Sequence, residues 1–131
     1  LELAIQVGAL HDVLEDVEHI DKQMLEVHFS AEVVSAVTAL SKDDRIMDKE
    51  AKLDDSLHRI AGCGIVEASV VKLADRITNL QPPPAHWSQE KCKAYAAQAE
   101  RIHQILGGAN SYLGLRLMDQ IKWYRNLRPQ P

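Results

Sequence analysis

Residues 65–80, with the sequence IVEASVVKLADRITNL, decide the fold class of this chain. The valines at positions 66, 70 and 71 favour a strand, whereas the apolar residues as a set recur with the period of a helix. That set is Val66, Val70, Leu73, Ile77 and Leu80. The run is longer than an ordinary strand, and the prolines at positions 82–84 would end a helix directly after it. We therefore predict a helix over residues 65–80.

Helical spacing and capping residues extend from this stretch in both directions. Ser30 and Ser88 can each cap the start of a following helix, and Gly62 and Gly64 can end one. The expected helices cover residues 1–17, 22–28, 31–40, 53–60, 65–80, 88–106 and 111–124. Residues 41–48 are polar and are expected to form a loop, and residues 128–131 a loose tail. The prediction is an all-α bundle of about six to seven helices.

Composition narrows the class of protein. The 131 residues suit one domain, and 15 basic against 19 acidic residues give a net charge of −4, without the basic surface of a nucleic-acid binder. No apolar run reaches the ~18 residues that span a bilayer, and we expect no signal peptide. Cys63 and Cys92 form no CxxC motif and are expected to be reduced. We therefore expect a cytoplasmic protein with neither nucleic acid nor membrane as a partner.

Residues 10–16, with the sequence LHDVLED, place imidazole and carboxylate groups on the first predicted helix. If that helix is continuous, its polar side chains share one stripe, apart from the apolar one. The stripe contains His11, Asp12, Glu15, Asp16 and His19. Clustered carboxylates repel one another unless they share a cation or proton, and imidazole with carboxylate suits Mn²⁺, Fe²⁺ or Zn²⁺. The alternative is a solvated acidic face on a surface helix.

Residues 71–80, with the sequence VKLADRITNL, carry a second polar stripe on the helix predicted over residues 65–80. Its members, at positions i, i+3, i+4 and i+7, are Lys72, Asp75, Arg76 and Asn79. By itself this stripe could be an ordinary ion-pair ladder. Two such motifs in one all-α chain are much harder to explain as accidents, and together they indicate a metal-dependent phosphohydrolase.

The two motifs and the residues between them resemble the hydrolase domain of the RelA/SpoT alarmone enzymes, within the HD-domain phosphohydrolase superfamily. The resemblance covers residues 1–106 and includes HDxxED at 11–16, VTALSK at 37–42 and LADRxxN at 73–79. It is greatest to the small single-domain bacterial versions that lack a synthetase domain. It implies an HD-domain helical bundle and a metal-dependent guanosine 3′,5′-bis(diphosphate) 3′-pyrophosphohydrolase, in which metal-activated water attacks the 3′-pyrophosphate.

The resemblance also implies which residues hold the metal and the water. His11, Asp12 and Asp75 are similar to the family's ligands for a divalent metal. That metal is expected to be Mn²⁺, with Fe²⁺, Zn²⁺ or Mg²⁺ as alternatives. Glu15 and Asp16 are similar to the acidic pair that positions or deprotonates the attacking water.

On the substrate side, Asn79 is similar to the family's asparagine that contacts the bound nucleotide. Lys72 and Arg76 lie on the same predicted stripe and are candidates for binding this small-molecule substrate. Arg76 could instead brace Asp75 or a neighbouring carboxylate, which is the alternative that we favour. The resemblance thus assigns the second motif both a metal ligand and a nucleotide contact.

The family has a further histidine ligand and a basic Arg-Lys stretch upstream of the His-Asp pair, and here His11 stands close to Leu1. We therefore expect residues 1–131 to be one HD-type domain that lacks its N-terminal helices, and whose activity depends on an upstream segment. Three alternatives stay open: an HD-type phosphohydrolase for another nucleotide or phosphoester, a degenerate nucleotide-binding domain without hydrolysis, and a plain helical interaction module. The apolar final helix could complete the core or supply a homodimer contact.

Overall fold

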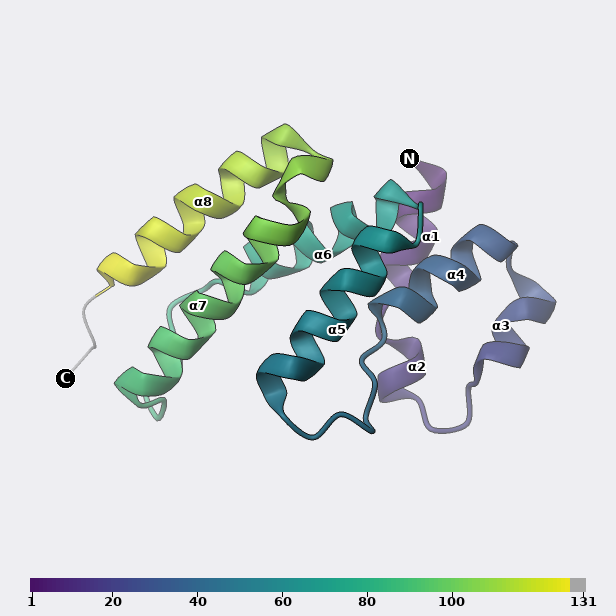
Figure 1. Ribbon diagram of the computed structural model, residues 1–131, viewed down its shortest axis with the longest axis horizontal. Coiled ribbons are helices and arrows are strands. Elements are labelled where there is room, and N and C mark those ends of the chain that lie inside the picture. Colours follow the sequence, from purple (N-terminus) through teal and green to yellow (C-terminus); the bar gives the residue numbers. More distant parts are fainter. Residues whose placement is uncertain (128–131) are drawn as a thin grey trace. The chain divides into compact units, whose positions relative to one another are not determined.

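The computed structural model describes residues 1–127 and shows an all-α chain, which confirms the predicted fold class (Figure 1). Its helices are α1 (Glu2–Leu10), α2 (Val13–Asp16), α3 (Lys22–His28), α4 (Ala31–Leu40), α5 (Lys49–Gly62), α6 (Val66–Asn79), α7 (Gln89–Leu106) and α8 (Ser111–Asn126). A short 3-10 helix, η1 (Gly107–Ala109), joins α7 to α8. No strand occurs between residues 1 and 127. The loose tail predicted for residues 128–131 lies outside the described residues.

The chain divides into two compact units, and the division falls inside α6. The first unit is Leu1–Val71 and the second begins at Lys72. Each unit has its own packed helices: α1, α3, α4 and α5 in the first, and α7, η1 and α8 in the second. The expectation of one HD-type domain over the whole chain stays a prediction.

Helix α6 confirms that residues 65–80 prefer a helix to a strand. Gly64, with φ 75, takes the left-handed conformation directly before it, as expected for a glycine that separates two helices. The buried face matches the predicted stripe only in part: Leu73 is fully buried as expected, whereas Ala68 is buried outside the stripe and Val66 is 52% exposed. Because Val66 is the first residue of α6, it lies at the end of the packed surface.

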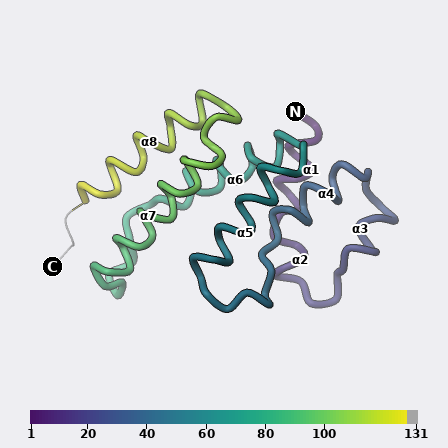
Figure 2. The backbone as a smooth tube through the Cα atoms, viewed as in Figure 1, coloured from purple at the N-terminus to yellow at the C-terminus, as the bar shows by residue number. Residues whose placement is uncertain are grey.

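In the first unit, α4 contacts α1, α3 and α5 (Figure 2). Ser30 caps its start, because the Ser30 hydroxyl accepts a hydrogen bond from the Val33 N–H at 3.3 Å. The side chains of α4 that are buried are Val33, Val34, Ala36, Val37, Ala39 and Leu40. Burial of each larger apolar side chain stabilises a fold by roughly 1.5–3 kcal/mol. Helix α4 is therefore the centre of this unit's core.

The single helix predicted over residues 1–17 is wrong, because the chain breaks at His11 and Asp12. The His11 ring donates from Nδ1 to the Gly8 carbonyl at 2.7 Å, and so competes with the backbone for a helical acceptor. Asp12 has φ −100 and ψ −2 and precedes α2. Its carbonyl accepts hydrogen bonds from the N–H groups of Glu15 and Asp16, which are the first helical hydrogen bonds of α2. The five polar residues of the first motif therefore do not share one continuous helical stripe.

In the second unit, α7 and α8 pack against each other and are joined by η1. Their buried residues are Ala96, Ala99, Ile102, Leu106, Gly114, Leu117, Ile121 and Tyr124. The small residues among them permit close approach, most tightly at Gly114, where an added Cβ would lie 2.5 Å from the Gly107 carbonyl oxygen. The Gln120 side-chain amide also donates to the Leu80 carbonyl at 2.7 Å, which ties α8 to the end of α6.

Candidate functional site

The turn between α1 and α2 brings together the first two predicted metal ligands. His11 Nε2 lies 3.1 Å from Asp12 Oδ2, and the two side chains are 23% and 58% exposed. Because a carbonyl can only accept, the contact with Gly8 requires a proton on His11 Nδ1. In neutral histidine the lone pair is then on Nε2, the atom that faces Asp12.

This geometry fits a pair of ligands on one metal ion. Metal-binding histidines usually donate their other ring N–H to a carbonyl or carboxylate, which fixes the tautomer, as the Gly8 carbonyl does for His11. Two ligand bonds of about 2.1 Å at a right angle separate their donor atoms by about 3.0 Å. The observed 3.1 Å is close to that value. Within residues 1–127, no group of three histidine, cysteine, aspartate or glutamate residues forms a cluster suited to a metal ion.

The acidic pair of the first motif lies on α2, with two different surroundings. The Glu15 carboxylate accepts a hydrogen bond from the backbone N–H of Lys42 at 2.5 Å. Asp16 is exposed at the last position of α2. His19 follows the end of α2 and is exposed, so the structure separates it from the helix that was expected to carry it. Glu15 thus connects the first motif to the loop after α4.

Arg59, which the sequence analysis did not single out, holds that same loop from α5. Its guanidinium donates to the carbonyls of Thr38, Ala39 and Ser41 at 3.0, 3.3 and 2.8 Å, and to the Asp55 carboxylate at 2.9 Å. These carbonyls belong to the last turn of α4 and its cap, where helical N–H partners become scarce, although the Thr38 carbonyl also accepts the Ser41 N–H at 3.2 Å. The sequence signal for Arg59 was its i,i+4 spacing from Asp55, which many surface helices share.

The second motif lies on α6 as predicted, and its residues differ in exposure. Lys72 and Asp75 are half-buried, Asn79 is exposed, and Arg76 is only 8% exposed. Burial lowers the pKa of Arg76, although the nearby Tyr95 and Asp75 favour its charged form. The Arg76 guanidinium lies over the Tyr95 ring, 4.3 Å from its centroid. The cation–π contact offsets part of the cost of burying this charge.

Aromatic side chains continue from Arg76 through the second unit. Tyr95 meets Trp87 edge-on at 5.4 Å between ring centroids and Tyr124 at 6.0 Å. Lys91 Nζ lies 4.4 Å from the Trp87 ring centroid. Burial, and after it the neighbouring Cys92, raises the pKa of Tyr124 to about 12. The Tyr95 ring of α7 therefore packs against the Tyr124 ring of α8.

The predicted site residues fall into two groups, one in each unit. The first unit contains His11, Asp12, Glu15 and Asp16, and the second contains Lys72, Asp75, Arg76 and Asn79. Within the first group, the structure places His11 Nε2 3.1 Å from Asp12 Oδ2. The joint action of both groups at one metal ion stays a prediction.

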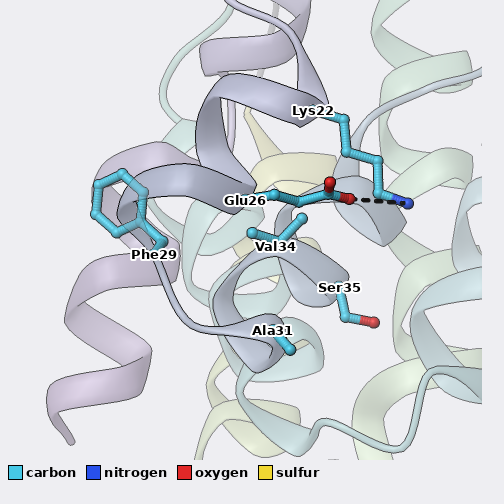
Figure 3. A pocket seen from close by; sticks show the side chains of 6 residues that line it. All are labelled: Lys22, Glu26, Phe29, Ala31, Val34 and Ser35. Atoms are coloured by element: carbon cyan, nitrogen blue, oxygen red, sulfur yellow. Dashed lines mark ion pairs between the residues drawn. The ribbon is translucent and has the colours of Figure 1, made fainter.

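A shallow pocket of about 410 Å³ lies elsewhere in the first unit (Figure 3). It is lined by Lys22, Glu26, Phe29, Ala31, Val34 and Ser35. Lys22 Nζ and Glu26 Oε1 are 3.9 Å apart at its edge. None of the predicted site residues lines this pocket, so it adds nothing to the candidate site.

Two curated proteins are similar to this chain, although no family model matches it. The guanosine-3′,5′-bis(diphosphate) 3′-pyrophosphohydrolase MESH1 of Drosophila melanogaster is 29% identical over 130 residues, which are 96% of this chain and 70% of that protein. The chain is a homologue of this enzyme. A guanosine-3′,5′-bis(diphosphate) 3′-pyrophosphohydrolase of Vibrio cholerae is 31% identical over 114 residues, or 77% of this chain but 16% of that longer protein. These relatives confirm the resemblance predicted from the motifs.

In the described part of the chain, no helix is both long and apolar enough to cross a membrane.

Proposed function

We propose that this protein is a metal-dependent hydrolase that removes pyrophosphate from the 3′ position of guanosine 3′,5′-bis(diphosphate). The observation that carries the proposal is the homology over 96% of the chain to an enzyme named for this reaction. The presence of both HDxxED and LADRxxN in the aligned chain supports it. Hydrolysis would break the bond between the 3′ oxygen and phosphorus and release GDP, or GTP from the 5′-triphosphate form.

The proposed metal is divalent, with Mn²⁺ as the first candidate. His11, Asp12 and Asp75 would hold it, and the fixed tautomer of His11 supports the first of these assignments. When bound, such a metal lowers the pKa of its water toward ~7 and offsets charge on the phosphate oxygens. Imidazole nitrogen with two carboxylates is a donor set that Mn²⁺, Fe²⁺ and Zn²⁺ accept, so metal analysis decides the identity.

The acidic pair would divide two tasks between its members. One Glu15 oxygen is already engaged by the Lys42 N–H, so this carboxylate is held in place to orient water. Asp16 is exposed at the end of α2, and we assign to it the acceptance of the proton. Removal of Glu15 would then slow turnover because the attacking water is no longer oriented, and removal of Asp16 would slow it because the proton has no acceptor.

The exposed Asn79 is proposed to contact the nucleotide, together with the half-buried Lys72 of the same helix. Arg76 is assigned a bracing role instead, since its guanidinium is buried over Tyr95 and near Asp75. We also propose a cytoplasmic location, which the free thiols of Cys63 and Cys92 support. A homodimer remains part of the proposal, to be tested by light scattering.

The decisive experiment incubates the full-length gene product with Mn²⁺ and guanosine 3′,5′-bis(diphosphate), and separates the products by anion exchange. We expect GDP and pyrophosphate, and we expect Asp75→Asn to lower turnover by at least about a hundredfold. The matched control is Asp119→Asn, which removes an exposed carboxylate from α8 and should leave turnover unchanged. Full activity of the Asp75 variant would refute the assigned chemistry.

A substrate panel and elemental analysis separate the alternatives. Hydrolysis of a different nucleotide or phosphoester, with guanosine 3′,5′-bis(diphosphate) untouched, would show an HD-type phosphohydrolase of other specificity. Nucleotide binding without bound metal or turnover in the full-length protein would show a degenerate domain. Either result would replace the proposed reaction.

A further inference from the structure

One peptide group in the first unit is held from both of its ends by charged side chains. The carbonyl of Ser41 accepts a hydrogen bond from Arg59 at 2.8 Å. The N–H of Lys42, which belongs to the same planar peptide group, donates to Glu15 at 2.5 Å. The three elements that meet here are α5, the end of α4 and α2.

This arrangement links the charges of Arg59 and Glu15 through a single amide. A positive donor on the carbonyl and a negative acceptor on the N–H both polarise the peptide in the same direction, so each hydrogen bond strengthens the other. Because the peptide is planar, its N–H cannot turn without turning its carbonyl. The direction in which Glu15 is held therefore depends on Arg59.

Arg59 is itself fixed by several contacts. The Asp55 carboxylate binds its Nε at 2.9 Å, and the carbonyls of Thr38 and Ala39 accept from its Nη1. The side chain is 35% exposed, so its orientation comes from this fork of hydrogen bonds rather than from burial alone. Arginine, with its rigid planar donors, can hold these carbonyls together, whereas lysine cannot.

We propose that Arg59 is a positioning residue for Glu15, and that it acts through the peptide group between Ser41 and Lys42. The inference rests on the proposed function, in which Glu15 orients the attacking water. Arg59 touches neither metal nor substrate in this scheme. Its contribution is to keep the Lys42 N–H directed at the carboxylate, because even a small misplacement of a catalytic group can slow a reaction by orders of magnitude.

The first experiment reads the peptide group directly by ¹H–¹⁵N NMR and hydrogen exchange. In Arg59→Ala, the Lys42 amide proton should move upfield and exchange at least about tenfold faster, as it should in Glu15→Gln. The control is Lys52→Ala, which removes the ion pair of α5 with Asp44 but leaves the Ser41–Lys42 peptide untouched. An unchanged Lys42 amide in Arg59→Ala would overturn the proposal.

The second experiment measures kcat and KM for the proposed substrate. Arg59→Ala should lower kcat by about tenfold to a hundredfold with KM nearly unchanged, whereas Lys52→Ala should alter neither. When Arg59→Ala is combined with Glu15→Gln, kcat should fall no further than in Glu15→Gln alone, because the effect of Arg59 passes through Glu15. Additive losses in the double variant would overturn the proposal.

The outcomes separate this inference from the function on which it rests. If the proposed function is wrong, the wild-type protein will not turn over the substrate. The NMR comparison of the variants would still decide whether Arg59 and Glu15 are coupled through the Ser41–Lys42 peptide. If circular dichroism shows that Arg59→Ala does not fold, Arg59→Lys takes its place. Arg59→Lys keeps the positive charge but loses the planar set of guanidinium donors. The hydrogen-exchange rate of the Lys42 amide should therefore still rise, and an unchanged rate would overturn the coupling.

Discussion

Replacement of Gly114 by alanine sets two effects of known size against each other. Alanine favours a helix interior over glycine by about 1 kcal/mol, which by itself would stabilise α8. The new Cβ, however, would lie 2.5 Å from the Gly107 carbonyl oxygen and 3.3 Å from its carbon. Overpacking of this kind costs about 1–3 kcal/mol.

Whether the Gly107 atoms can move away from the new Cβ decides which effect is larger. The atoms that the Cβ would meet are backbone atoms of η1, which cannot rotate away as a side chain can. The clash is therefore expected to lie at the upper end of its range, and the variant should lose about 1–2 kcal/mol in the free energy of unfolding. For a chain of this size, that loss lowers the melting temperature by roughly 4–8 °C.

The assay is thermal and urea unfolding followed by circular dichroism, with Gly62→Ala as the matched control. Gly62 is the last residue of α5, and an added Cβ there meets nothing within 4 Å. The same substitution should therefore be neutral or stabilise by up to about 1 kcal/mol. If Gly114→Ala proved as stable as Gly62→Ala, the inferred close approach of α8 and η1 would be refuted.

Three further predictions concern the core and two titrating groups. Leu57→Ala, at a fully buried position of α5, should cost about 2–5 kcal/mol in urea unfolding, and a loss below 1 would contradict that burial. The hydrogen-bonded Arg125 lowers the pKa of Glu100, so their pair should stabilise the fold above pH ~4.3 and stop doing so as pH falls through the lowered pKa. The melting temperatures of wild type and Arg125→Gln should therefore converge in acid, and a constant difference would exclude this linkage. Tyr124, whose pKa burial raises to about 12, should contribute stability below pH ~10 that is lost as pH rises toward 12. Absorbance at 295 nm, as wild type minus Tyr124→Phe, should show that late ionisation, and titration of this residue near pH 10 would contradict it.

Local signals in the sequence were sufficient for most of the helices. Ser30 and Ser88 cap α4 and α7 as predicted, because a capping hydroxyl and the N–H that it accepts are only three residues apart. Periodicity likewise distinguished α6 from a strand. It failed at His11, because the side chain's bond to Gly8 interrupts a pattern that looked continuous in apolar residues alone.

The sequence by itself thus determined the all-α class, the two motifs and the family that they resemble, since each rests on neighbouring residues or on short spacings. Only the tertiary structure decided that Arg59 reaches carbonyls 18–21 residues before it, and that Glu15 holds an N–H 27 residues ahead. It also decided that Gly114 must remain small. These contacts join segments whose approach depends on how whole helices pack, and no local pattern of residues specifies that packing.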